Sequence, residues 1–262
     1  MPVFSDQTGR ILNLQKTPAR IISIVPSQTE LLYDLGLDKE VIGITKFCVH
    51  PASWFKTKPR VGGTKQLKME IIHQLNPDLI LANKEENLKE QVEDLEKHYP
   101  VWISDVKTMQ DARSMIQELG KITGKEIKAN VLINQIDIAF SNLKTQYKKL
   151  KTAYLIWQNP YMTAGGDTFI HAMLEAAGFE NIFANKLRYP EITFKELSIA
   201  HCQLLLLSSE PFPFKQKHIK EMQPQLPKTK IILVDGEMFS WYGSRLLKAP
   251  FYFQELQQQV YG

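Results

Sequence analysis

The chain has 262 residues, of which 44% are hydrophobic and 23% charged, so it is long enough to bury one large core or two smaller ones. Its formal charge of +4 is too small, and too scattered along the sequence, to indicate nucleic-acid binding. The two cysteines, Cys48 and Cys202, form no C-x-x-C pair, which argues against a disulfide framework and a structural zinc site.

The N-terminal half alternates short, β-branched apolar runs with helical patterns. Ser27 and Glu30 have capping-box spacing, which predicts a helix from Thr29 to Leu35 that stops at Gly36. The other predicted elements are strands at 20–25, 41–45, 78–82 and 101–103, and helices at 69–75 and 87–98. Strands separated by helices in this way indicate a parallel sheet covered on both faces.

From about Met109 to Leu150 the pattern is almost wholly helical, interrupted only near Thr123-Gly124. One apolar stripe runs along it at spacings of three and four residues, formed by Ile136, Phe140, Leu143, Tyr147 and Leu150. The densest basic stretch, Lys144 to Lys151, lies on this predicted helix and is interpreted as a solvated face.

After this segment the βα pattern resumes, with strands at 152–157, 203–207 and 230–234 and helices at 168–177 and 251–260. The two halves resemble each other faintly, as in LLYDLGLDKEVIG from Leu31 and MLEAAGFENIF from Met173. The sequence therefore predicts an α/β fold of two Rossmann-like lobes joined by one long helix, with a ligand cleft between the lobes. The predicted boundaries are 1–124 for the N-terminal lobe, 125–150 for the connecting helix and 151–262 for the C-terminal lobe.

No catalytic motif is present: there is no G-x-G-x-x-G after a strand, no P-loop, no G-x-S-x-G and no H-E-x-x-H. Cys48 and His50, two residues apart, could touch a metal, but two ligands do not define a site and a buried thiol is the commoner outcome. Gly165-Gly166-Asp167-Thr168 opens a helix that Asp167 or Thr168 can cap, which favours a structural turn over an anion contact. We predict a binding protein rather than an enzyme, with no catalytic residues and no intrinsic metal or cofactor.

Aromatic residues follow several predicted strands. They sit where ligands bind in α/β sheets, at the carboxyl ends of the strands, and they suit a large, flat, partly apolar ligand. Packing of these aromatic residues at the lobe interface is the alternative explanation. The candidate ligand-binding residues are Phe47, Cys48, His50, Thr64, Lys65, Asn83, Glu85, Trp157, Tyr161, Phe239, Trp241, Tyr242 and Arg245.

The order of several segments resembles the helical-backbone substrate-binding proteins of ABC importers. These segments are RIISIVPSQTELLYDLGL, VIGITKFCVHP, VGGTKQLKMEIIHQLNPDLILA, the long helix and VDGEMFSWYGSRL. The resemblance runs from about Arg20 to the C-terminus and is greatest to cobalamin-binding members, with ferric-siderophore and haem binders also similar. It implies a metal-chelate ligand, cobalamin or another corrinoid ahead of a siderophore or haem, bound without chemistry by a monomer.

The resemblance also implies docking of a glutamate of each lobe to an ABC permease. Glu70 matches the first position, whereas the second falls at Lys195, with Glu196 one residue later. Family members work in the periplasm, but the N-terminus MPVFSDQTGRILNL has no signal-peptide pattern and no apolar run is long enough to insert into a membrane. The alternative is a leaderless, cytoplasmic cofactor-handling protein or enzyme on the same scaffold.

Overall fold

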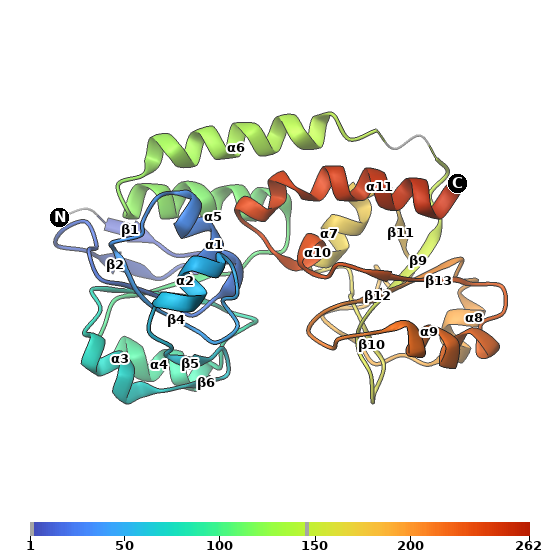
Figure 1. The fold of residues 1–262 in the computed structure, drawn as a ribbon, viewed down its shortest axis with the longest axis horizontal. Coiled ribbons are helices and arrows are strands. Elements are labelled where there is room, and N and C mark those ends of the chain that lie inside the picture. Colours follow the sequence, from blue (N-terminus) through green and yellow to red (C-terminus); the bar gives the residue numbers. More distant parts are fainter. Residues whose placement is uncertain (1–2, 145–146) are drawn as a thin grey trace. The chain divides into compact units, whose positions relative to one another are not determined.

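The computed structural model describes residues 3–144 and 147–262, and the chain forms two compact units (Figure 1). Unit 1 comprises Met1–Val106, Gln110–Asp137 and Tyr242–Arg245. Unit 2 comprises Lys107–Met109, Ile138–Trp241 and Leu246–Gly262. The short segment Tyr242–Arg245 therefore belongs to the unit built mainly from the first half of the chain.

Unit 1 is built on a four-stranded, wholly parallel sheet of order β4-β3-β7-β8. Its elements in chain order are β1 (Val3–Ser5), β2 (Ile11–Asn13), β3 (Ile21–Ser23), α1 (Pro26–Asp34), β4 (Val41–Ile44), α2 (Ala52–Thr57), β5 (Gly62–Gly63), β6 (Gln66–Leu67), α3 (Met69–Leu75), β7 (Leu79–Asn83), α4 (Lys89–Glu96), β8 (Val101–Ser104), α5 (Met109–Ile122) and most of α6 (Glu126–Ser141). Ile72 of α3 and Leu95 of α4 pack on one face of the sheet with Ile22 and Ile80. Figure 1 shows α1 and α5 on the other face, which explains the almost continuous apolar runs of the strands.

Unit 2 has a five-stranded sheet in which β9, β12 and β13 are parallel neighbours, β11 pairs with β9 in parallel, and β10 pairs with β9 antiparallel. Its elements are β9 (Lys151–Trp157), β10 (Met162–Thr163), α7 (Phe169–Ala176), β11 (Glu180–Asn181), α8 (Phe194–Ile199), β12 (Leu204–Ser208), α9 (Gln216–Met222), the 3-10 helix η1 (Gln223–Gln225), β13 (Lys230–Val234), α10 (Glu237–Ser240), and α11 (Ala249–Tyr261), with the 3-10 helix η2 (Ser244–Leu247) shared by both units. Leu197 of α8 and Met222 of α9 cover one face. Tyr154 and Phe253 pack with α10 on the other face, where Figure 1 also shows α7 and α11.

The predicted α/β fold with two lobes is confirmed, and most predicted strands and helices lie within one or two residues of the observed bounds. The prediction that Ser27 and Glu30 form a capping box is wrong. Pro26 occupies the first turn of α1, so Val25 is the N-cap, Ser27 lies inside the helix, and no side chain caps this end. The fixed φ of proline suits the first helical position, which lets the helix begin earlier than the Ser27 signal suggests.

The predicted interruption of the helical segment near Thr123-Gly124 is confirmed, because Gly124, with a φ of 67°, separates α5 from α6. The connecting helix ends at Ser141 rather than at Leu150. Beyond Ser141, the Tyr147 ring stacks on the Tyr261 ring, with 4.2 Å between the ring centroids. The carbonyl of Lys148 accepts a hydrogen bond from the Tyr261 hydroxyl. Tyr147 and Lys148 therefore contact α11 and are not part of a continued α6. Residues 145–146 of the predicted helix and of its basic stretch lie outside the described residues.

Candidate functional site

In unit 1 the loops at the carboxyl ends of β3, β4 and β7 lie at one edge of the sheet. Phe47, three residues after β4, is 51% exposed, and the Lys46 ammonium lies 5.0 Å from its ring centroid. The ring also lies against Gly63, where a Cβ would come within 3.1 Å of it. The absence of a side chain at Gly63 therefore allows the Phe47 ring to pack against β5 while about half of the residue stays exposed.

The loop after β7 is shaped by Asn83, which is buried. Its side-chain oxygen accepts hydrogen bonds from the amides of Glu85 and Glu86, at 2.8 and 3.1 Å. Its amide group donates to the Ser104 hydroxyl at 3.0 Å. Asn83 therefore positions the two glutamates rather than presenting itself at the surface.

The segment Tyr242–Arg245 completes this edge of unit 1. The Tyr242 hydroxyl donates to Glu86 at 2.9 Å, and burial together with this carboxylate raises the pKa of Tyr242. Arg245 Nε donates to Glu30 of α1 at 2.8 Å, and both side chains are buried. Gly243, at a φ of 136°, lies so close to α1 that a Cβ would be 3.3 Å from the Ser27 carbonyl oxygen.

In unit 2 the corresponding edge carries Trp157 at the end of β9, which is 40% exposed. Its ring makes an edge contact with Phe212 at 5.8 Å between centroids, and the Phe212 amide donates to the Ile156 carbonyl. Tyr161 is partly buried and packs on Phe194 at 4.9 Å. Trp157 and Phe212 thus form a second aromatic surface, supported by backbone hydrogen bonding.

A largely buried carboxylate, Glu210, lies beside this surface in the loop after β12. Its Oε1 accepts hydrogen bonds from the Ser240 hydroxyl at 2.7 Å and from the Trp241 indole at 2.9 Å. Burial raises the pKa of Glu210, and the nearby Glu237 and Asp235 raise it further. Glu210 therefore fixes the orientation of Trp241.

Because the pKa of Glu210 is higher in the folded protein than in the unfolded chain, the folded state binds more protons between these two values. The free energy of unfolding should therefore fall as the pH rises through this window. Glu210→Gln keeps an oxygen that can accept from Ser240 and Trp241, so we expect the variant to lose this pH-dependent decrease. Urea unfolding of both proteins from pH 4 upwards measures it, and parallel pH profiles would contradict the assignment.

The other predicted contacts differ in their burial. Cys48 is fully buried, its thiol is within 3.2 Å of the hydroxyls of Thr29 and Thr45, and burial raises its pKa. Phe239 is core, packed on Tyr154 and Phe253. His50 is partly buried in the loop of Phe47, and Thr64 (partly buried) and Lys65 (exposed) directly follow Gly63, which contacts the Phe47 ring.

The two predicted docking glutamates differ in their surroundings. Glu70 is exposed in the first turn of α3. Glu196 closes a capping box with Thr193 at the start of α8 and accepts from Lys186 at 2.8 Å, contacts that lower its pKa. Neighbouring Lys195 is exposed.

Gly165 and Gly166 make a structural turn. Their amides donate to the carbonyls of Arg188 and Lys186, and a Cβ on Gly166 would lie 2.0 Å from the Ala184 oxygen. Thr168 caps α7 as predicted, by accepting from the His171 amide. These amides are therefore not available to an anion.

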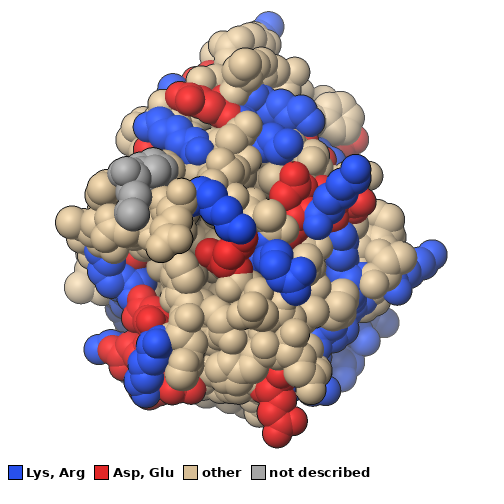
Figure 2. Space-filling model, turned by 90° about the vertical axis from the view of Figure 1, so that its left-hand side faces the viewer, with Lys and Arg blue, Asp and Glu red and all other residues tan. Residues whose placement is uncertain are grey.

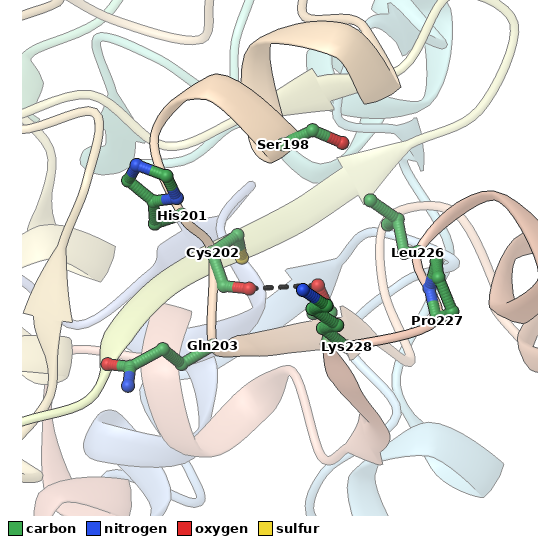
Figure 3. Close-up of a pocket in the computed structure, with 8 residues that line it drawn as sticks. Ser198, His201, Cys202, Gln203, Leu226, Pro227 and Lys228 are labelled. Carbon is green, nitrogen blue, oxygen red and sulfur yellow. Dashed lines mark hydrogen bonds between the residues drawn. The ribbon is translucent and has the colours of Figure 1, made fainter.

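A pocket of 370 Å³ lies at the opposite, amino ends of β12 and β13 (Figure 3). It is lined by Ser198, His201, Cys202, Gln203, Leu226, Pro227, Lys228 and Thr229. The Thr229 hydroxyl donates to the Cys202 carbonyl, and burial raises the pKa of the Cys202 thiol to about 11. The pocket is therefore separate from the aromatic surface around Trp157.

Among residues 3–144 and 147–262, no group of three or more His, Cys, Asp or Glu side chains could hold a metal ion. No helix in the same ranges is long and apolar enough to cross a membrane. Figure 2 shows acidic and basic side chains interspersed over one face of the molecule.

Sequence reasoning missed Glu30, Glu86, Glu210 and Phe212. The three glutamates lie in loop or helix patterns typical of solvated charge, and their partners, Arg245, Tyr242 and Trp241, are distant in sequence. Phe212, in the stretch SSEPFPF after β12, could have been found by its position at a strand end.

The model of the family described as periplasmic binding protein matches residues 21–230. The vitamin B12-binding protein of Photorhabdus laumondii is 27% identical over 257 residues, covering 95% of this chain and 90% of that protein. Two solved structures from Vibrio cholerae share the fold. The periplasmic vitamin B12-binding protein has a TM-score of 0.76 at 18% identity, covering 93% of this chain and 99% of that chain. The periplasmic haem-binding protein has a TM-score of 0.78 at 21% identity, with the same coverages.

Proposed function

The chain belongs to the periplasmic binding protein family. We propose that it is the substrate-binding component of an ABC importer for a metal chelate, and that this chelate is a corrinoid. It is a binding protein, not an enzyme. The observation that carries the proposal is the pair of exposed aromatic rings, Phe47 in unit 1 and Trp157 in unit 2, each at the carboxyl edge of its parallel sheet. Such rings suit the broad, partly apolar surface of a macrocycle.

The charge at these edges supports a corrinoid over a strongly anionic siderophore. Recognition of several carboxylates or catecholates favours a group of arginines. Arg245, the arginine among the candidate residues, forms a buried ion pair with Glu30. The names of the similar vitamin B12-binding proteins support the same ligand class.

Calorimetric titration with cyanocobalamin, cobinamide, haemin and a ferric catecholate siderophore tests the proposal. We expect saturable binding of the two corrinoids and weaker binding of the siderophore. Tighter binding of haemin or the siderophore would overturn the corrinoid assignment, and no binding of any of the four at high-micromolar concentration would overturn the metal-chelate function.

We further propose that unit 1 docks to the permease through Glu70, which is exposed, while Glu196 of unit 2 serves mainly to cap α8 and pair with Lys186. Charge reversal at Glu70 should then weaken binding to the detergent-solubilised permease far more than Glu196→Gln. Equal effects of the two substitutions would contradict this asymmetry.

A further inference from the structure

The aromatic surface of unit 2 continues into the interior through a series of ring contacts. Phe212, whose ring touches Trp157, also packs on Phe214, with 4.8 Å between the ring centroids. The His218 ring lies 5.5 Å from that of Phe212 and 5.4 Å from that of Phe214. We call Phe212, Phe214 and His218 the ring cluster. Trp157 is 40% exposed and His218 is 4% exposed, so the contacts lead from an exposed ring to a buried one.

The loop that carries Phe212 has weak backbone pairing. The two prolines that flank Phe212 have no amide hydrogen to donate. The Phe212 amide donates to the Ile156 carbonyl at 3.2 Å, and the Phe214 amide donates to the Ser208 carbonyl at 3.3 Å. These distances lie at or beyond the usual upper limit of about 3.2 Å for a hydrogen bond between N–H and oxygen. Packing within the ring cluster therefore contributes to the position of Phe212.

His218 makes two separate contacts, one with its Nδ1 atom and one with the faces and edges of its ring. The Nδ1 atom accepts a hydrogen bond from the Lys215 amide at 2.8 Å, which caps the start of α9. An accepting Nδ1 carries no proton, so the side chain is the neutral form with its proton on Nε2. The hydrogen bond restrains the orientation of the ring, and the ring in turn contacts Phe212.

We propose that His218 is a positioning residue for ligand binding, because its ring holds Phe212 in place against Trp157. The proposal rests on the proposed function, since it assigns the ligand to the exposed ring of Trp157. His218 is buried, so it acts through Phe212 and not by contact with the ligand. The alternative role is structural, in which His218 only caps α9. The two roles use different parts of the side chain, so substitutions can separate them.

Two substitutions at this position divide the contacts of His218. His218→Gln keeps an oxygen that can accept from the Lys215 amide, as glutamine does in a capping box, but removes the ring. His218→Phe keeps a ring of similar size and removes the acceptor. We expect His218→Gln to weaken cyanocobalamin binding roughly tenfold and His218→Phe to change it less than about twofold, because the aromatic pairs survive in the second variant alone. Calorimetric titration measures the affinity, and urea unfolding checks that both variants are folded.

A second readout needs no ligand. The chain has four tryptophans, whose indole N–H signals can be followed in a nitrogen–proton correlation spectrum of the free protein. Trp157→Phe identifies the signal of Trp157. We expect His218→Gln to move this signal, His218→Phe to move it less, and both variants to leave the signal of the buried Trp102 in unit 1 unchanged. His201→Gln, which removes an exposed imidazole of unit 2, is the control and should affect neither the spectrum nor the affinity.

The outcomes separate the two roles. A loss of affinity in His218→Phe but not in His218→Gln would assign His218 to capping alone and overturn the proposal. Equal losses in the two variants, or an unmoved Trp157 signal in His218→Gln, would overturn it as well. Failure of the parent protein to bind cyanocobalamin would overturn the corrinoid assignment, whereas the spectrum of the free protein would still decide whether His218 positions Trp157.

Discussion

Replacing Arg245 with Met should lower the free energy of unfolding by about 3–5 kcal/mol, the usual cost of removing one partner of a buried ion pair. Arg245 and Glu30 are both buried, and the substitution leaves the Glu30 carboxylate without its guanidinium. Urea unfolding at neutral pH, followed by circular dichroism, measures the loss.

The exposed Lys149–Glu175 pair in unit 2 provides the control, because Lys149→Met should cost at most about 1 kcal/mol. Combining Arg245→Met with Glu30→Met should restore part of the loss, since the double variant leaves no buried charge at this position. If Arg245→Met costs no more than Lys149→Met, the buried pair does not hold this segment in unit 1.

Trp157→Ala should weaken corrinoid binding by about 2 kcal/mol, or roughly thirty-fold, because the ring is exposed and supplies a large apolar contact. Its free energy of unfolding should change little, since the ring is not part of the core. Phe47→Ala should behave in the same way from unit 1. Calorimetric titration with cyanocobalamin and urea unfolding of each variant separate the two effects.

Phe239→Ala is the matched control, because Phe239 was also a candidate contact but is fully buried. It should lose about 3–5 kcal/mol of stability through the cavity it leaves, with little effect on the affinity of the folded fraction. Unchanged affinity in Trp157→Ala would contradict the role of Trp157 as a ligand contact. A large loss of affinity without destabilisation in Phe239→Ala would contradict the role of Phe239 as a core residue.

Much of the fold follows from local pattern. The buried strands have apolar runs of the right length, and α3 begins and ends where the sequence predicts because Asn76 and Pro77 terminate it. Two errors arose where tertiary or neighbouring effects override that pattern. Pro26 shifts the start of α1, and Tyr147 and Lys148 contact Tyr261 of α11 instead of extending α6, which ends at Ser141.

The candidate site was predictable in position but less so in detail. Placing aromatic residues at strand ends finds Phe47 and Trp157, but it cannot tell them from Phe239, which follows β13 and turns into the core. The buried carboxylates escaped prediction because local sequence does not reveal burial. Glu30 and Glu210 look like solvated charge until the distant Arg245 and Trp241 are placed beside them.

The position of Tyr242–Arg245 in unit 1 has a consequence for synthesis of the chain. The first unit cannot finish folding as it emerges, because the residues that bind Glu86 and Glu30 are made only after the whole unit 2 segment Ile138–Trp241. Nascent chains that stop before Tyr242 will carry an N-terminal half whose buried glutamate has no arginine, a state suited to recognition by chaperones or proteases.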